Sequence, residues 1–250
     1  MKAERTEPMS GTSKALRRSK SFTLIVFLLF ICSTSLAVPA EAEWFADLYL
    51  GGEFTQTGDI DVGLSGVGVS GVTISLKDVA FDNSFEVGGR AGYWFETLSF
   101  LGLGLDVFHF RPDISSQTVR ATFLGMPGTV TLDDIDIRVI GITLDLMLRW
   151  PLLKSGDFPK GRLQPYTSLG PAIFITKTKP AGLEADTDTS LGLKVGAGAT
   201  FLITPNIGIF GEYRFTHVSP EFKFTTAGTV SKPEFDINTH HLIVGASFRF

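Results

Sequence analysis

From Trp44 to the end of the chain, apolar and polar residues alternate with a period of two in eight separate runs. In one of them, Ile142 and Leu144 alternate with Thr143 and Asp145. Side chains at every second position share one face of a β-strand, so each run predicts a strand with one apolar face and one face of glycine and charge. The runs cover residues 44–54, 84–95, 101–107, 140–150, 163–177, 191–201, 209–215 and 242–250.

Two all-β architectures show this alternation, the soluble β-sandwich and the transmembrane barrel. The exposed face of a sandwich normally carries Lys, Thr and Ser, whereas the polar face here is mainly glycine with single charges. Segments of about ten residues with apolar side chains outward and glycine or charge inward are typical of a transmembrane barrel, which also has an even number of strands. Closure gives every backbone N–H and C=O in the bilayer a partner. We therefore predict an eight-stranded antiparallel transmembrane β-barrel.

The connections between the runs alternate between long and short. Long connections include residues 57–83 and 111–133, while a short one is the turn Thr204-Pro205-Asn206. Outer-membrane barrels have long external loops and short periplasmic turns. This predicts a protein of the cell outer membrane with both termini of the mature chain in the periplasm, and with loops 57–83 and 111–133 as a recognition surface outside the cell.

The first part of the chain has the layout of a secretory signal peptide. Basic residues precede the apolar run from Phe22 to Cys32, and the small-residue stretch ends at Ala40-Glu41-Ala42. We expect residues 1–42 to be the signal peptide and residues 43–250 to form the barrel domain. A retained anchor helix is the alternative, but the run is short for a bilayer of about 30 Å. Either Met1 or Met9 is the start.

Composition removes several classes of protein. The chain has 22 Lys and Arg against 26 Asp and Glu, so the basic surface of a nucleic-acid-binding protein is absent and no nucleic-acid partner is expected. Hydrophobic residues make up 44% of the chain, which excludes a disordered protein. Cys32 is its one cysteine and falls in the predicted signal peptide, so disulfides do not stabilise the mature domain.

Four short segments carry a family resemblance: Gln164-Pro165-Tyr166 with Gly170, the stretches 193–198 and 212–215, and the last strand from His241 to Phe250. In this order they resemble the outer-membrane β-barrel-domain family, whose architecture is shared with the transmembrane domain of outer membrane protein A and with the opacity adhesins. The resemblance implies that the wall contacts outer-membrane lipids and lipopolysaccharide. It also implies that the aromatic end, with Phe248 and Phe250, is the signal read by the barrel-assembly machinery.

Charged residues on the lumen side of the predicted strands form the main candidate site. Unpaired charges in a narrow barrel would be costly, so we expect an ion-pair network in which Arg90, Lys194 and Arg214 compensate the carboxylates. Counting from the strand ends places Asp145 at the depth of Arg90. A gate for small ions is the alternative interpretation. The predicted network comprises Glu53, Glu86, Arg90, Asp106, Asp145, Lys194, Glu212 and Arg214.

One pair of residues suggests an enzyme. His217 and Ser219 could begin a nucleophile and base pair, and this His-x-Ser resembles that of outer-membrane lipid A deacylases. The resemblance ends there, because Pro220 and Glu221 follow where that family has Asn-Ala. Both side chains have the parity of the lipid-facing residues and are expected at the membrane rim. Whether the chain is an enzyme stays open, and the sequence favours a non-enzymatic role.

The remaining motifs predict no metal site and no cofactor. Residues 66–71 match a dinucleotide-binding G-x-G-x-x-G pattern, but that motif requires a strand before it and a helix after it. His240 and His241 are adjacent on a strand and point to opposite faces. The sequence thus favours a structural or surface-interacting barrel that meets an extracellular ligand through its loops. A lipid A deacylase-like enzyme and a narrow, porin-like channel for small solutes or ions are the alternatives.

Overall fold

The computed structural model describes residues 43–66, 69–182, 184–226 and 229–250. The predicted signal peptide, residues 1–42, lies outside the described residues, as do Val67 and Gly68 of the G-x-G-x-x-G match. Over the described part of the chain, none of the helices reaches the length and apolar character needed to cross a membrane. The described residues form fourteen β-strands in two sheets.

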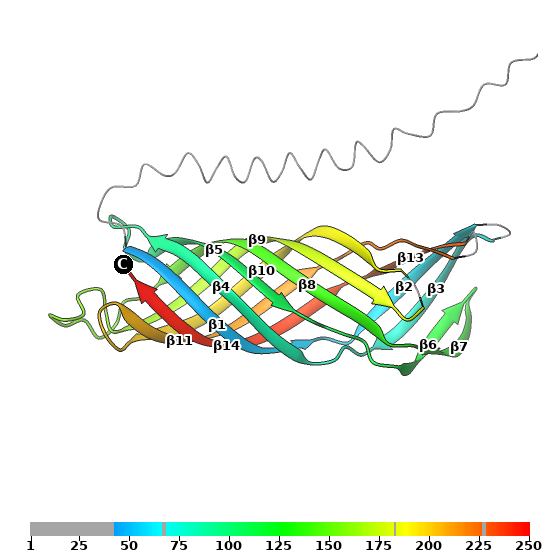
Figure 1. The fold of residues 1–250 in the computed structure, drawn as a ribbon, viewed down its shortest axis with the longest axis horizontal. Coiled ribbons are helices and arrows are strands. Elements are labelled where there is room, and N and C mark those ends of the chain that lie inside the picture. The colour runs from blue at the N-terminus through cyan, green and yellow to red at the C-terminus, as the bar shows by residue number, and fades with distance from the viewer. Residues whose placement is uncertain (1–42, 67–68, 183, 227–228) are drawn as a thin grey trace, which may run out of the picture. The chain divides into compact units, whose positions relative to one another are not determined.

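Eight of these strands close into an antiparallel barrel in the order β1-β14-β11-β10-β9-β8-β5-β4 (Figure 1). Each predicted run corresponds to one of these strands, so the predicted fold is confirmed. The barrel strands are β1 (Glu43–Thr55), β4 (Ser84–Trp94), β5 (Leu101–Phe110), β8 (Ile135–Arg149), β9 (Leu163–Pro180), β10 (Asp186–Leu202), β11 (Ile207–Val218) and β14 (Ile237–Arg249).

Pairing of the first strand with the last one closes the barrel. β1 pairs with β14 from Phe45↔Arg249 to Thr55↔Thr239. Its other side pairs with β4. Because every barrel strand has two neighbours, the wall has no free edge, as a bilayer requires.

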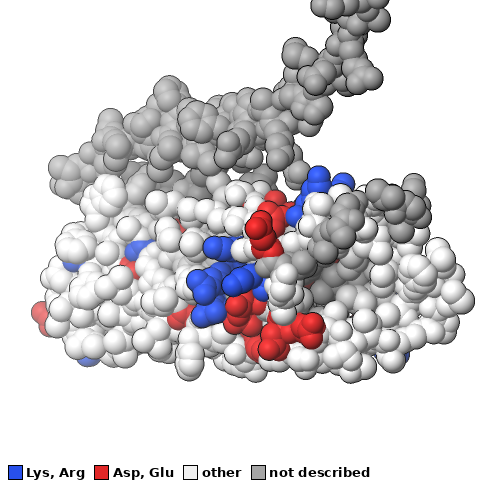
Figure 2. Space-filling view, turned by 45° about the vertical axis from the view of Figure 1, so that its right-hand side comes forward, with Lys and Arg blue, Asp and Glu red and all other residues white. Residues whose placement is uncertain are grey.

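The two faces of the wall differ as the alternation predicts. On β1, Leu48 and Leu50 are exposed on the outside at 64% and 62%, while Asp47 and Tyr49 are buried inside. Most of the molecular face in Figure 2 carries no charged side chain, and the charges on it gather mainly in one region. An apolar outer wall and a polar interior suit a barrel surrounded by lipid.

Three of the long connections fold into a second, six-stranded sheet, which we call the extension. It lies at one end of the barrel (Figure 1). Its order, β12-β13-β2-β3-β6-β7, follows that of the barrel strands to which these segments connect, so it continues the wall. Its strands are β2 (Gly58–Gly66), β3 (Val69–Val79), β6 (Gln117–Phe123), β7 (Met126–Leu132), β12 (Phe224–Thr226) and β13 (Thr229–Phe235).

An apolar core fills the inside of the extension. Ile60, Leu76 and Val119 are buried there, in one hydrophobic cluster with Phe110 and Ile137 of the barrel strands. This burial explains why the long connections are ordered strands, because they have an apolar face to remove from water.

The start of β1, the C-terminus and the connections 95–100, 150–162 and 203–206 lie together at the other end of the barrel. The amide of Ile203 donates to the carbonyl of Ile207 at 2.8 Å in the turn between β10 and β11. The amide of Phe250 donates to the carbonyl of Trp44 at 3.0 Å, which joins the last residue to the start of β1. We call this the terminal end.

Candidate functional site

The barrel strands place all eight predicted lumen residues inside the barrel. Each stands at an inward position of its strand, and each is at most 4% exposed. These residues are Glu53, Glu86, Arg90, Asp106, Asp145, Lys194, Glu212 and Arg214. Burial at this level means that a charge without a partner would be strongly unfavourable.

Arg214 on β11 lies at the centre of the network. Its guanidinium donates to Glu86 at 2.6 Å, to Asp106 at 2.9 Å and to Glu212 at 3.1 Å. The guanidinium also lies over the ring of Tyr49, 4.9 Å from its centroid. One planar cation therefore joins carboxylates from β4, β5 and β11 across the lumen.

Lys194 on β10 makes the second set of contacts. Its ammonium lies 2.5 Å from both Asp106 and Asp145. Counting along the strands placed Asp145 with Arg90, and the register explains the difference. Gly170 pairs with Lys194, and Leu146 pairs with Leu169 on the neighbouring strand, so Gly170 stands beside Asp145. Since Gly170 has no side chain, Lys194 reaches past it to that carboxylate.

Arg90 on β4 completes the network toward the terminal end. It contacts Asp47 and Glu212, each at 2.8 Å, and donates to the hydroxyl of Tyr166 at 3.2 Å. Ser247 donates a hydroxyl hydrogen bond to Asp47 at 2.5 Å. Glu212 is shared with Arg214, so the contacts of Arg90, Lys194 and Arg214 form one continuous network.

Two lumen residues lie toward the extension. His241 is fully buried, with Nδ1 2.6 Å from Glu86 and Nε2 2.9 Å from the hydroxyl of Thr216. Glu53 accepts hydroxyl hydrogen bonds from Ser84 at 2.7 Å and from Thr55 at 2.9 Å. Glu53 is thus satisfied by hydroxyls, unlike the carboxylates around Arg214.

A second ion pair occupies the terminal end of the lumen. Arg149 donates to Glu43 at 2.7 Å, and its guanidinium lies 4.4 Å from the centroid of the Trp94 ring. Lys160, from the turn between β8 and β9, lies 3.4 Å from Glu43. Glu43, Arg149 and Trp94 are buried in the lumen on the terminal side of the network, and Lys160 is half exposed beside them.

The sequence-based set omitted several residues that the structure brings into the lumen. Tyr49 donates to Asp106 at 2.5 Å and Tyr166 donates to Glu212 at 2.7 Å. Their inward parity was available as a signal, as it was for Asp47 and His241. What the sequence does not contain is the register that brings these side chains to the same carboxylates.

The structure gives His217 and Ser219 separate partners. His217 Nδ1 lies 2.7 Å from Asn238 Oδ1, while the Ser219 hydroxyl donates to Asp236 at 2.5 Å. In this arrangement the Ser219 proton is directed to a carboxylate rather than to an imidazole. A serine nucleophile that is activated by histidine requires its hydroxyl proton to be directed to the imidazole.

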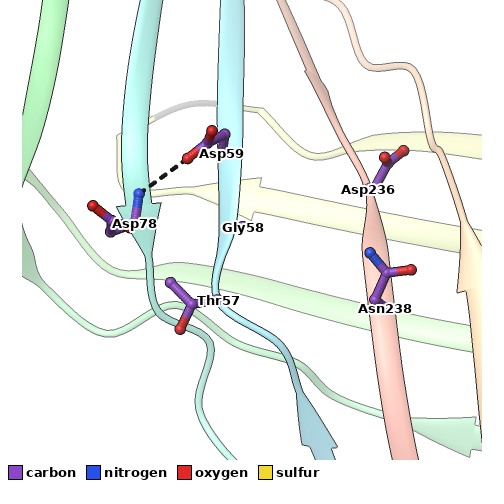
Figure 3. Close-up of a pocket in the computed structure, with 6 residues that line it drawn as sticks. All are labelled: Thr57, Gly58, Asp59, Asp78, Asp236 and Asn238. Atoms are coloured by element: carbon purple, nitrogen blue, oxygen red, sulfur yellow. Dashed lines mark hydrogen bonds between the residues drawn. The ribbon is translucent and has the colours of Figure 1, made fainter.

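A polar pocket of about 320 Å³ lies where the extension meets the barrel (Figure 3), and one of its lining residues, Asp236, accepts the hydrogen bond from Ser219. Its carboxylates already have partners. Asp59 contacts Lys77 at 2.6 Å and accepts the Asp78 amide at 3.2 Å. Asp78 in turn contacts Arg120. The pocket is lined by Thr57, Gly58, Asp59, Asp78, Asp236 and Asn238.

Among the described residues, no group of three or more His, Cys, Asp or Glu side chains is arranged to hold a metal ion. His241 points into the lumen, whereas His240 on the outside lies 2.5 Å from the Tyr213 hydroxyl and 2.7 Å from Gln56 Nε2. The adjacent histidines thus take opposite faces of β14.

A family model described as the outer membrane protein beta-barrel domain matches residues 28–250. The chain belongs to this family. Membership makes it an outer-membrane β-barrel protein that sits in the lipid of that membrane. A comparison with curated proteins finds no match.

A comparison with solved structures finds outer-membrane proteins that are similar to this chain. The outer membrane protein OprG from Pseudomonas aeruginosa is 15% identical, with 84% of this chain and 96% of that chain covered and a TM-score of 0.58. Neisserial surface protein A is 16% identical over 81% of this chain and 97% of that one, with a TM-score of 0.45. Ail of Yersinia pestis, solved with the heparin analogue sucrose octasulfate, is 15% identical over 84% and 99%, with a TM-score of 0.41. At these identities the likeness concerns the fold alone.

Proposed function

We propose that this member of the family is a closed, non-conducting barrel that displays its extension at the cell surface as a structural and recognition element. The observation that carries the proposal is the fully buried pair Arg214 and Lys194, whose side chains are 0% exposed and bridge carboxylates across the lumen. Conduction needs a continuous wet path with sites that an ion can enter and leave. Side chains locked in ion pairs leave no such path.

The proposal includes an orientation. Residues 1–42 act as the signal peptide, both ends of the mature chain face the periplasm, and the extension faces outward. The three connections that fold into the extension lie at one end, whereas the terminal end has the shorter connections 95–100 and 203–206 together with the thirteen-residue connection 150–162. This asymmetry supports the orientation, because periplasmic turns are short in bacterial barrels. Phe248 lies near the end of β14 and Phe250 follows that strand, with 75% of its surface exposed, which suits a segment read by the assembly machinery.

Planar-bilayer recordings of the purified barrel test closure. We expect no conductance steps from the wild type or from Lys154→Ala, which removes an exposed lysine in a turn at the terminal end. Double substitution of the central cations, Lys194→Ala with Arg214→Ala, is expected to give steps, because the side chains that bridge the lumen are then gone. Steps from the wild type at neutral pH would refute the closed barrel.

Cysteine labelling tests orientation. Gly128→Cys on β7 and Gly156→Cys in the turn between β8 and β9 are matched, because a Cβ at either position meets no atom within 4 Å. In intact cells a membrane-impermeant maleimide is expected to label Gly128→Cys only, and both variants after the outer membrane is permeabilised. Labelling of Gly156→Cys alone in intact cells would reverse the orientation.

Deletion of the β6–β7 hairpin, residues 117–132, tests the recognition role. Cells that display the full chain are expected to be retained on some members of a panel of immobilised glycans and matrix proteins, and cells with the deletion are expected to lose that retention. Labelling at Gly156→Cys after permeabilisation checks that the shortened chain is assembled. Equal retention of both strains across the panel would contradict recognition by this hairpin.

A further inference from the structure

The outer wall of β8 and β9 changes from apolar to basic in a single step toward the extension. Along this strand pair, the outward positions opposite one another are Ile142↔Ile173, then Ile140↔Ile175. The next outward pair is Arg138↔Lys177, and Asp136↔Lys179 follows it. The basic pair therefore stands directly beyond the last residues of the apolar wall.

Arg138 and Lys177 are both exposed and face each other across the ladder. Side chains at directly opposed positions have Cβ atoms about 5 Å apart, and like charges there are destabilising. In the segments that the structure describes, neither residue makes an ion pair or a side-chain hydrogen bond. Asp136 stands opposite Lys179, and Asp113 accepts the amide of Ile137 and lies 3.7 Å from Arg111. With Arg111 included, four cations meet these two carboxylates, so the group keeps an excess of positive charge.

The basic group occupies only one side of the barrel. β8 and β9 lie across the barrel from β14 and β1 in the strand order. Where β1 and β14 leave the apolar wall, their outward side chains are Gln56, Asn238 and His240, with no lysine or arginine among them. On the near side, β10 adds the exposed hydroxyl of Thr187, which pairs with Lys177. The positive group is therefore a local site rather than a general property of the rim.

We propose that Arg138, Lys177 and Lys179 bind a phosphate group of the anionic glycolipid of the outer leaflet, lipid A. The apolar wall below them sets the level of the acyl chains, so these cations lie at the level of the headgroups. A guanidinium matches the geometry of phosphate oxygens, and an anion between Arg138 and Lys177 removes their mutual repulsion. The acyl chains of the same lipid lie along Ile140 and Ile175.

Binding to lipid nanodiscs tests the site. The full chain is compared with the double variant Arg138→Gln, Lys177→Gln and with the control Lys154→Gln, which removes an exposed lysine at the terminal end. Diphosphorylated lipid A in phosphatidylcholine is the probe, and native mass spectrometry counts the lipid retained on the barrel. Each basic residue at a membrane surface contributes about fivefold in affinity, so the double variant should bind lipid A about 25-fold more weakly. The control should match the wild type.

Two further arms separate the sources of phosphate. Lipid A without phosphates should be retained about as weakly by the wild type as intact lipid A is by the double variant. Millimolar inorganic phosphate should not displace intact lipid A, and complete displacement would indicate a site for a free anion and overturn the proposal. Equal retention of lipid A by the wild type and a correctly folded double variant would also overturn it. Variants that migrate like the wild type on a gel when the samples are not boiled are correctly folded.

This inference rests on the proposed orientation, in which the extension end meets the outer leaflet. Nanodiscs present lipid A to both ends of the barrel, so the binding result does not depend on orientation. If the wild type and the double variant retain lipid A equally while Gly128→Cys is labelled in intact cells, only the proposed lipid site is overturned. If the double variant binds lipid A more weakly but Gly156→Cys is the variant labelled in intact cells, the proposed orientation is overturned. The assignment of the site to lipid A of the outer leaflet then fails with it.

Discussion

Arg214 offers the most informative perturbation of the lumen, because its guanidinium contacts Glu86, Asp106 and Glu212. In Arg214→Ala each carboxylate keeps at least one other partner: His241 for Glu86, Lys194 and Tyr49 for Asp106, and Arg90 and Tyr166 for Glu212. The cost is therefore that of one broken buried network rather than of three stranded charges, about 3–5 kcal/mol of unfolding free energy. Loss of the contacts with the Tyr49 and Phe108 rings acts in the same direction.

Equilibrium urea unfolding in phosphatidylcholine vesicles, followed by tryptophan fluorescence, measures this loss. Arg214→Lys keeps the charge but not the planar fork, so it should fall between the wild type and Arg214→Ala. Arg138→Ala removes an exposed arginine and should change the unfolding free energy by less than about 0.5 kcal/mol. If Arg214→Ala stays within about 1 kcal/mol of the wild type, the network does not stabilise the barrel and the reasoning fails.

Three further predictions concern other parts of the chain. Gly92→Ala should lower the unfolding free energy by about 1–3 kcal/mol, because a Cβ would collide with a backbone carbonyl of the next strand. Gly89→Ala, on the outer face of the same strand, should be nearly neutral, and equal urea midpoints for the two variants would contradict this reasoning. A hydrogen bond from Lys77 holds the pKa of the Asp59 carboxyl below its usual range, so the contact between them stabilises the fold at neutral pH and is lost as the pH falls through the lowered pKa. An NMR titration should show a higher Asp59 midpoint in Lys77→Gln, and an unchanged midpoint would exclude Lys77 as the cause. Ser219→Ala should leave the lipid A acylation pattern of cells unchanged by mass spectrometry, because Ser219 donates to a carboxylate; loss of an acyl-chain product would instead identify an enzyme.

Much of the lumen site could be predicted from parity alone. Side chains alternate between the faces of a strand by local backbone geometry, so Arg90, Asp106 and Arg214 could be assigned to the same interior before any pairing was known. The same parity would have included Asp47 and His241. Selecting partners was a different matter, since Asp145 contacts Lys194 through the register of β8, β9 and β10 rather than through equal counting along the strands.

The sheet of the extension could not be predicted from the local pattern of apolar and polar residues. Residues 57–83, whose apolar residues in a Gly-rich stretch predicted a hairpin above the membrane, fold into β2 and β3, which pair as that hairpin. Residues 111–133, expected as a long loop, fold into β6 and β7. Their apolar residues alternate less regularly than those of the barrel, and a single connection has no apolar surface of its own on which to fold. The strands become stable when three connections pair side by side and bury Ile60, Leu76 and Val119 together.

By itself, the sequence determined that this chain is an eight-stranded membrane barrel with an apolar outside and a charged inside, because period-two alternation is a property of consecutive residues. Only the tertiary structure decided which cation meets which carboxylate, that the connections build a second sheet, and that Arg138 stands opposite Lys177 at the edge of the apolar wall. Those features depend on register between strands far apart in the chain, and register follows from the stagger of the closed barrel, which only the complete set of strands defines.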